Sequence, residues 1–202
     1  NYTNVCYFKC QFCAFSKGKL SENLRGRPYD ITGEDIAARC VEAWERGATE
    51  VCMQGGIHPD YTGQTYLDIV HTVRSVAPEL HIHAFSPLEV WQGAATLGVS
   101  VPTFLRQLRQ AGLKRAMVSS SSDEEAQKLY AEAPDLVLPA LRPYRTRGEI
   151  GTWAHDASIV GHLESRLQRY RYVAIGEYHV YGADADLPVV RWHVSQAAVV
   201  GK

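Results

Sequence analysis

Residues 32–56, TGEDIAARCVEAWERGATEVCMQGG, contain one helix and one strand in succession, and this pair decides the fold class. A threonine followed three residues later by an aspartate is typical of a helix start, and Gly47 is typical of a helix end. Apolar side chains recur between them at helical spacing. Residues 49–54 then predict a short buried strand that ends at Gly55 and Gly56. A helix that leads directly into a strand is the repeating unit of α/β proteins.

The same alternation continues along the rest of the chain. It predicts helices at 66–76, 88–97, 101–110, 123–133, 158–169 and 187–200, and strands at 80–85, 115–120, 135–141 and 172–180. Repeated units of this kind imply a parallel sheet with right-handed crossovers. A complete eight-fold barrel takes about 250 residues. The 202 residues therefore predict an α/β fold in the form of a partial or hybrid (β/α) TIM-type barrel.

The composition argues against several classes of partner. The 21 basic and 22 acidic residues leave a net charge of −1, which gives no electrostatic reason to expect nucleic acid or an anionic membrane. No apolar run approaches the roughly 18 residues of a membrane-spanning helix, and the first residues lack the pattern of a signal peptide. We therefore expect a cytoplasmic protein. Because the chain begins with Asn1, we also expect it to be a piece of a longer one.

Three of the five cysteines, Cys6, Cys10 and Cys13, lie within eight residues in the segment CYFKCQFC. Clustered cysteines outside oxidising compartments favour a metal or redox site over disulfides. Three thiolates suit a [4Fe-4S] cluster and leave one iron open to a substrate or cofactor. A zinc site with four ligands or three unrelated buried cysteines are the alternatives. Cys40 and Cys52 are expected to be small core residues.

The spacing C-x3-C-x2-C resembles that of radical S-adenosylmethionine (SAM) enzymes. Three segments extend the resemblance: NYTNVCYFKCQFCAFSKG at 1–18, EVCMQGGIHPDYTG at 50–63 and HIHAFSPLEVWQGAATLG at 81–98. Over residues 1–113 they resemble, in family order, the FO synthase family. The likeness is to its tyrosine-using half, which transfers a 4-hydroxybenzyl group in the biosynthesis of the deazaflavin precursor of coenzyme F420.

This resemblance implies the cofactors and the substrates. Cys6, Cys10 and Cys13 would ligate a [4Fe-4S] cluster whose open iron takes S-adenosylmethionine, and Tyr7 or Phe12 would shield the cluster loop. An electron from a donor such as ferredoxin or flavodoxin would start cleavage of the cofactor to a 5′-deoxyadenosyl radical. That radical would activate tyrosine, and the 4-hydroxybenzyl fragment would join 5-amino-6-(D-ribitylamino)uracil.

A glycine pair follows the first strand and belongs to the same implied site. Gln54, Gly55 and Gly56 match the motif that receives the methionine part of the cofactor. Residues without a Cβ allow close approach, and the carboxyl ends of parallel strands face the ligand crevice. An ordinary turn is the alternative reading of two adjacent glycines.

Polar residues on the next segments are assigned to the substrate pocket. The resemblance implies catalytic or binding roles for His58, His81, His83 and Glu89, and the alternation in HIHAF puts His81 and His83 on one side of a strand. Two alternatives stay open for the histidines, metal ligation and a structural role. For Glu89 the alternative is a first-turn acid that follows a helix N-cap at Ser86.

Residues 111–202 resemble a metal-dependent amidohydrolase-type barrel. The predicted organisation is a radical SAM half-barrel at 1–113 followed by an amidohydrolase-like half-barrel at 114–202. Three explanations stay open: a fusion that closes one hybrid barrel, a truncated radical enzyme with a foreign tail, or an artefactual junction. In IGEYHVYG, Glu177 and His179 alternate onto one face at a strand end, where they would hold a divalent metal such as zinc that activates water. The alternative is that Glu177 pairs with a nearby arginine.

Three functions compete on these grounds. The first is a radical SAM transferase of the FO synthase type, acting on small molecules. The second is a metal-dependent hydrolase that uses His81, His83, Glu177 and His179. The third is a fragment that binds the cluster without turnover.

Overall fold

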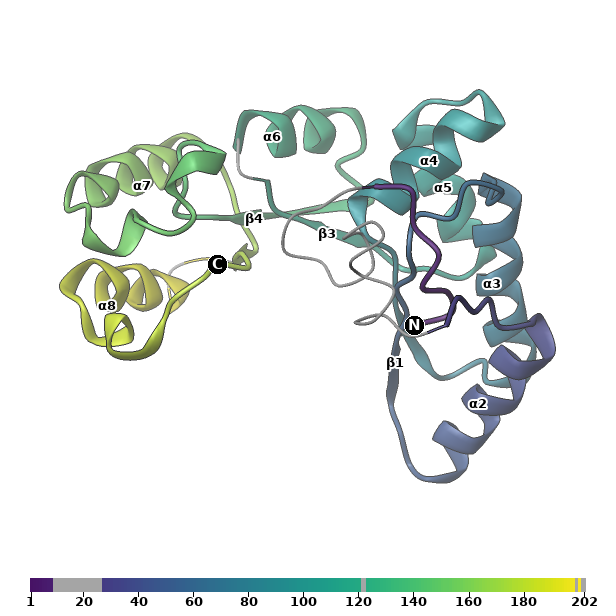
Figure 1. Cartoon of the computed structure of the whole chain (residues 1–202). Helices are drawn as coiled ribbons and strands as arrows, with labels where there is room; N and C mark the ends of the chain where they lie inside the picture. Colours follow the sequence, from purple (N-terminus) through teal and green to yellow (C-terminus); the bar gives the residue numbers. More distant parts are fainter. Residues whose placement is uncertain (9–26, 121–122, 199, 201–202) are drawn as a thin grey trace. The chain divides into compact units, whose positions relative to one another are not determined.

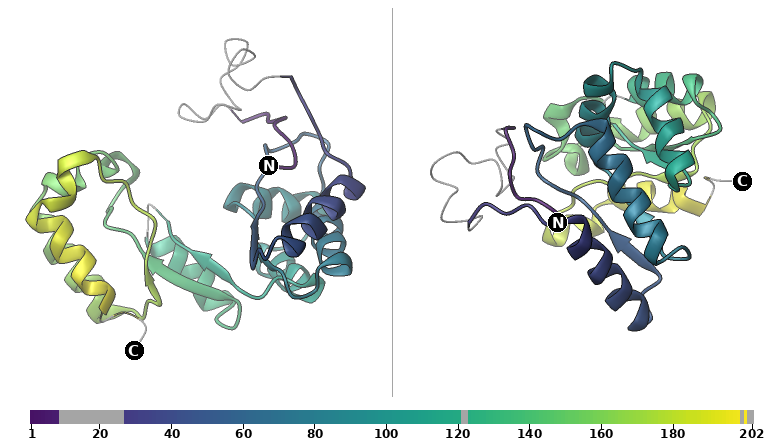
Figure 2. Two further views of the ribbon diagram at one scale, coloured as in Figure 1. Left: turned by 90° about the horizontal axis from the view of Figure 1, so that it is seen from below. Right: turned by 90° about the vertical axis from the view of Figure 1, so that its right-hand side faces the viewer.

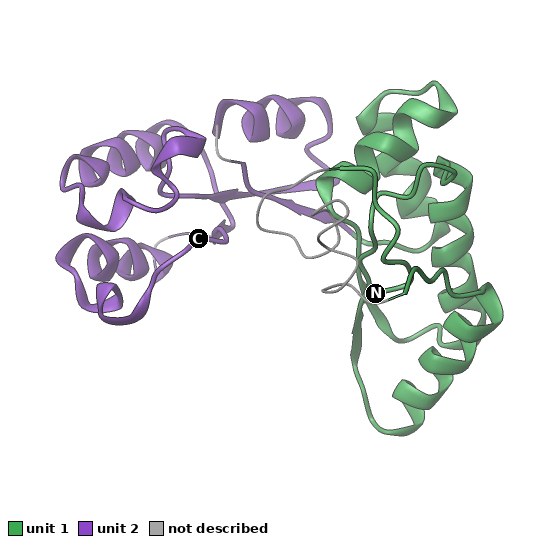
Figure 3. Ribbon diagram, viewed as in Figure 1, with its two compact units in different colours: residues 1–114 green, residues 115–202 purple. Residues whose placement is uncertain are grey.

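Helices and strands alternate along the chain in the computed structural model (Figure 1). The structure describes residues 1–8, 27–120, 123–198 and 200. The chain divides into two compact units, residues 1–114 and residues 115–202 (Figure 3). Within the described ranges, the helices are too short or too polar to cross a membrane.

Unit 1 contains two short parallel strands and helices packed against them. Its elements are α2 (Gly33–Glu45), β1 (Glu50–Cys52), α3 (Gly63–Val76), β2 (His81–His83), α4 (Pro87–Leu97) and α5 (Val101–Ala111). β1 pairs with β2 so that Val51 lies beside Ile82. The helices gather on one side of the two strands (Figure 2). Ile82 is buried on that side, so the residues that flank it in sequence lie on the opposite face.

Helix α3 supplies the centre of the core of unit 1. Tyr66, Val70 and Val73 recur at helical spacing and are fully buried. Phe104 of α5 packs against α4 at Gly93, where a Cβ would lie 2.3 Å from the phenyl ring. The absence of a side chain at Gly93 therefore sets how closely α4 and α5 approach each other.

The helices of unit 1 begin close to the predicted positions. The Thr32 side chain accepts a hydrogen bond from the backbone N–H of Asp35 at 3.1 Å and caps α2. Helix α3 begins three residues before the predicted Tyr66. The reason is local, because the Thr65 hydroxyl accepts the Thr62 N–H at 3.2 Å and starts the helix earlier.

Unit 2 contains a three-stranded parallel sheet in the order β3-β4-β5. Its elements are β3 (Ala116–Val118), α6 (Asp123–Glu132), β4 (Val137–Leu141), α7 (Ser158–Arg169), β5 (Ala174–Ile175), α8 (Pro188–Ser195) and the 3-10 helices η3 (Arg147–Glu149), η4 (Trp153–His155), η5 (Gly182–Asp186) and η6 (Gln196–Ala198). The fully buried Trp153 contacts the rings of Tyr144, Tyr178 and His193 edge-on. Trp153 and Tyr144, with apolar residues of α7 and α8, belong to the buried core of unit 2, and Tyr178 packs against it.

The predicted α/β class with parallel strands is confirmed. Among the described residues the strands form two open sheets, and no barrel is closed.

The predicted strand at 172–180 is wrong over most of its length, because β5 covers only Ala174–Ile175. The Gly176 N–H still donates to β4, but the N–H of His179 donates to the Tyr144 hydroxyl at 2.7 Å. A side chain thus replaces a neighbouring strand as the partner of this backbone.

A buried ion pair joins the elements of unit 2. Arg166 of α7 donates through Nε to the Asp123 carboxylate at 2.8 Å and through a terminal nitrogen to Glu124 at 2.7 Å. The Tyr172 hydroxyl donates to the same Asp123 carboxylate. Both Arg166 and Asp123 are buried, so each charge depends on the other for solvation.

We predict that Arg166→Met destabilises the chain by roughly 3–5 kcal/mol, because it leaves the Asp123 carboxylate buried without its counter-charge. Urea unfolding measures the loss, and adding Asp123→Asn should recover part of it. Arg169→Met, on the exposed face of the same helix, is the matched control. A loss at Arg166 no greater than at Arg169 would show that the pair does not support the fold.

Candidate functional site

The N-terminal segment lies along the turn that follows β1. The N–H of Gly56 donates to the carbonyl of Thr3 at 2.9 Å, and the N–H of Tyr7 donates to the carbonyl of Ile57 at 3.1 Å. These two backbone bonds flank Cys6, whose thiol is partly buried. The first predicted cluster ligand therefore lies just beyond the carboxyl end of a parallel strand, which is where ligands bind in such sheets.

The two glycines are required by this contact. A Cβ on Gly56 would lie 2.1 Å from the carbonyl oxygen of Val5 and 2.9 Å from the Cβ of Cys6. A Cβ on Gly55 would lie 2.4 Å from the ring of Tyr2. Close approach was expected from a cofactor at this turn. The structure shows that the chain's own Cys6 segment already approaches this closely.

Glu89 joins the glycine turn to the start of α4. Its side chain is fully buried and accepts hydrogen bonds from the N–H of Gly55 at 3.0 Å, the N–H of Ser86 at 2.6 Å and the hydroxyl of Tyr2. Ser86 caps α4 and completes a capping box with Glu89. Burial raises the pKa of Glu89 to about 7, although the bonds from Ser86 and Gly55 oppose the shift. The open alternative, a first-turn acid after an N-cap, describes these contacts; a catalytic role for Glu89 stays a prediction.

His58 lies within its own turn. Its ring stacks on Tyr61 with the centroids 4.8 Å apart, and its Nδ1 accepts the N–H of Asp60 at 3.1 Å. Gln92 of α4 donates to the His58 carbonyl at 2.7 Å. These contacts are those of a histidine with a structural role, and its assignment to the substrate pocket stays a prediction.

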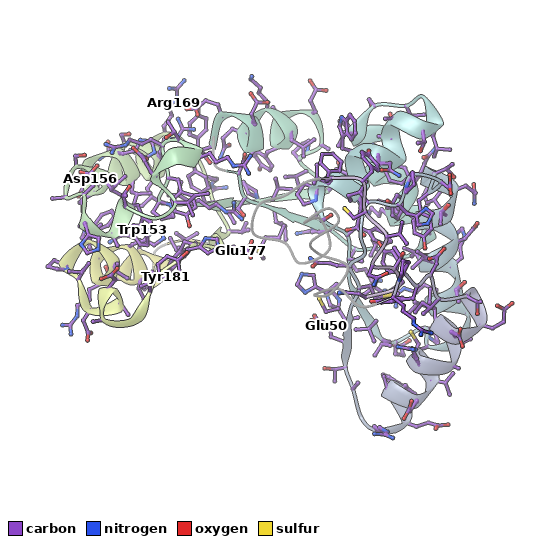
Figure 4. The ribbon with its side chains drawn as sticks, in the orientation of Figure 1. Glu50, Trp153, Asp156, Arg169, Glu177 and Tyr181 are labelled. Atoms are coloured by element: carbon purple, nitrogen blue, oxygen red, sulfur yellow. The ribbon has the colours of Figure 1, made fainter. Side chains whose placement is uncertain are left out.

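His81 and His83 project from the same face of β2, as their alternation predicts, and both are exposed. Across the strand pair, the carboxylate of Glu50 lies 3.5 Å from a ring nitrogen of each. Glu50, the first residue of β1, is labelled in Figure 4. The sequence reasoning missed Glu50, although the spacing of residues 50–52 and 81–83 in parallel register would place it beside His81.

Of the remaining predicted residues of this site, two are described by the structure and three are not. Tyr7 is exposed and packs on Phe8 with ring centroids 4.9 Å apart, and Gln54 is exposed beside the glycine pair. Cys10, Phe12 and Cys13 lie outside the described residues.

The two isolated cysteines behave differently. Cys40 is buried in α2 as predicted, and burial raises the pKa of its thiol. The prediction that Cys52 is a core residue is wrong, because Cys52 is exposed. It shares the exposed face of β1 with Glu50, since side chains two residues apart in a strand point the same way.

The proposed second metal site lies in unit 2. The exposed Glu177 pairs with Arg142 at 2.9 Å, which is the arginine pairing considered as the alternative. The Nδ1 of His179 lies 3.2 Å from the hydroxyl of Tyr144. Within the ranges that the structure describes, His, Cys, Asp and Glu side chains do not gather in groups of three able to hold a metal ion. Metal binding by Glu177 and His179 stays a prediction.

The family model of the Radical SAM superfamily matches residues 1–146, so the chain belongs to this superfamily. Membership implies a [4Fe-4S] cluster and S-adenosylmethionine. The described part of the cysteine segment fits the cluster, because a partly buried thiol, a ligand type that iron-sulfur clusters require, is held at the carboxyl end of β1 by backbone bonds.

More specific similarity is to FO synthases and to a tyrosine transferase. The chain is 36% identical over 166 residues to FO synthase of Streptomyces coelicolor and 44% identical over 167 residues to FO synthase of Nocardia farcinica. These matches cover 81% and 82% of the chain but 19% of each relative. It is also 42% identical over 113 residues to the 5-amino-6-(D-ribitylamino)uracil--L-tyrosine 4-hydroxyphenyl transferase of Methanopyrus kandleri, covering 56% of the chain and 30% of that protein. The chain thus spans less than a third of the length of these relatives.

We predict that Gly56→Ala lowers the iron bound per chain by more than half after anaerobic reconstitution. The new methyl group meets the backbone of Val5 and displaces the segment that carries Cys6. Gly161→Ala is the matched control, because a Cβ there meets open space in α7. Equal iron contents in the two variants would show that the close contact does not position the ligand.

We also predict that the pKa of Glu89 makes stability fall with rising pH. The folded-state pKa of about 7 exceeds the ordinary value of 4.5, so the native state holds the proton more tightly. This contribution is fully present below pH 4.5 and is lost as the pH rises through 7, by on the order of 3 kcal/mol. Urea unfolding between pH 5 and 8 measures it. Glu89→Gln should remove this part of the pH dependence, and an unchanged slope would contradict the assignment.

Proposed function

We propose that the chain is the cluster- and cofactor-binding part of a radical SAM enzyme of the FO synthase type, with the 4-hydroxybenzyl transferase activity of its tyrosine-using half. The observation that carries the proposal is the docking of the Cys6 segment on the Gly55–Gly56 turn at the end of β1. The similarity to FO synthases and to the tyrosine transferase supports it. The substrates proposed are tyrosine and 5-amino-6-(D-ribitylamino)uracil, which the name of the transferase contains.

In this proposal, Cys6, Cys10 and Cys13 hold the cluster, and Tyr7 and Phe12 shield it. When bound, the cluster supplies the electron that cleaves S-adenosylmethionine. The backbone bonds to Gly56 and Ile57 hold the start of the cysteine segment in place, which reduces the ordering required on binding.

The glycine turn is proposed to receive the methionine part of the cofactor together with Gln54. The N–H groups of Gly55 and Gly56 already donate to Glu89 and to Thr3. Backbone contacts of the cofactor with this turn therefore fall to carbonyl oxygens, which accept hydrogen bonds from an ammonium group. The amino group of S-adenosylmethionine has the matching chemistry.

The remaining proposals concern the surroundings of the site. His58, His81, His83 and Glu89 are proposed to contribute to the substrate pocket. The parallel strands are proposed to belong to a partial TIM-type barrel, which keeps water from the reacting groups. The enzyme is proposed to be cytoplasmic and to receive its electron from a ferredoxin or flavodoxin.

Reconstitution tests this function. The chain, loaded with iron and sulfide under anaerobic conditions and reduced with dithionite, is expected to form 5′-deoxyadenosine from S-adenosylmethionine, and more of it when tyrosine is present. Cys10→Ala should abolish both the cluster absorbance and the product, because two thiolates hold the cluster poorly. Cys40→Ala, which removes a thiol outside the loop, should retain both. A cluster that forms equally in Cys10→Ala would overturn the proposal.

A further inference from the structure

The exposed face of the β1–β2 pair carries polar side chains at every position. Glu50 and Cys52 of β1 lie beside His81 and His83 of β2 in parallel register. All four side chains are exposed, whereas Ile82, between the histidines, is buried against the opposite face. Glutamate is depleted in strands, so the position of Glu50 at the start of β1, on this face, has no explanation in strand propensity.

One carboxylate contacts both rings. The Glu50 Oε2 lies 3.5 Å from Nε2 of His81, and its Oε1 lies 3.5 Å from Nδ1 of His83. The three side chains are between 46% and 64% exposed. Ion pairs at such exposure contribute little to stability. The contacts with Glu50 therefore matter more for the orientation of the two histidine rings than for the stability of the fold.

When the rings are neutral, the carboxylate 3.5 Å away favours one tautomer of each histidine. A negative oxygen beside one ring nitrogen favours the proton on that nitrogen, and in neutral imidazole the other nitrogen is then an acceptor. Because Glu50 faces Nε2 of His81 and Nδ1 of His83, the favoured acceptors of the neutral rings are Nδ1 of His81 and Nε2 of His83. Two acceptors two residues apart on one strand suit a ligand with several N–H and O–H donors, and they disfavour a carboxylate.

We propose that Glu50 is a positioning residue that sets His81 and His83 as a pair of hydrogen-bond acceptors for the amino and hydroxyl groups of the aminouracil substrate. This inference rests on the proposed function. It assigns the face to the substrate with neutral donors, and not to the carboxylate of tyrosine. It also gives a role to Glu50, which was not among the predicted site residues.

The test compares Glu50→Gln, which keeps the shape and removes the charge, with Glu50→Asp, which keeps the charge. Glu45→Gln, an exposed carboxylate on α2, is the matched control. Nitrogen-15 NMR of the histidine rings in the oxidised, reconstituted chain reports the tautomers. We expect Glu50→Gln to shift the tautomer populations of His81 and His83, and Glu50→Asp to restore them in part. Unchanged populations in Glu50→Gln would overturn the proposal.

Binding measurements provide the second readout. Calorimetry with 5-amino-6-(D-ribitylamino)uracil is expected to show an affinity about tenfold lower in Glu50→Gln, with tyrosine binding unchanged. An equal loss for both substrates would indicate a merely structural role and overturn the proposal. So would stoichiometric Zn²⁺ binding that disappears in Glu50→Gln, because the rings would then be metal ligands. If the NMR and affinity changes occur but no 5′-deoxyadenosine forms, the proposed radical function fails while the assignment of Glu50 stands.

Discussion

The packing of the Cys6 segment against Gly56 is the contact on which the site depends. It is a contact between two stretches of backbone, with a hydrogen bond from Gly56 to Thr3 and no space for a side chain between them. Glycine in a fixed conformation loses more conformational entropy on folding than other residues. That cost is offset here, because only a residue without a Cβ brings the thiol of Cys6 to the end of β1. The contact with the N-terminal segment is therefore sufficient to require glycine at both positions.

A buried acid reinforces this contact. Glu89 accepts hydrogen bonds from Tyr2 of the N-terminal segment, from Gly55 of the turn and from Ser86 at the start of α4. Burying an ionised carboxylate is unfavourable, and the raised pKa shows that the protein relieves this cost partly by keeping the proton. A single side chain thus fixes three segments that are distant in sequence. An apolar residue of the same size would fill the space but leave two backbone donors without a partner.

The sequence was sufficient for features that depend on neighbouring residues. Caps at Thr32 and Ser86, the helix-strand alternation and the shared side of His81 and His83 all follow from short-range rules, and they agree with the structure. The sequence was insufficient where a residue distant in the chain determines the local structure or its burial. A period of two shows which residues share a face but not which face is buried, so Cys52 was wrongly placed in the core.

The predicted end of the strand at 172–180 was wrong for the same reason, because a residue distant in sequence determines it. Nothing in residues 172–180 indicates that the hydroxyl of Tyr144, far away in sequence, takes the backbone donor of His179. Glu50 was missed because its partners lie on the next strand, and only the register of β1 with β2 brings them together. The cysteine motif differs, because its three cysteines lie close together in sequence and their spacing is itself the signal.

Residues 50–56 contribute both to the histidine face and to the contact with the Cys6 segment. In seven residues the chain places a carboxylate on the exposed face, a buried Met53 in the core and two glycines against the cysteine segment. Because side chains alternate along a strand and Gly56 follows β1 by four residues, shifting this segment by one residue would move Glu50 away from the histidines and Gly56 away from Val5 together. The register of one short parallel pair therefore affects both the contact of the Cys6 segment with Gly56 and the histidine face. Because both features depend on the same register, two short strands packed on the apolar face of α3 bring together residues that lie far apart in sequence.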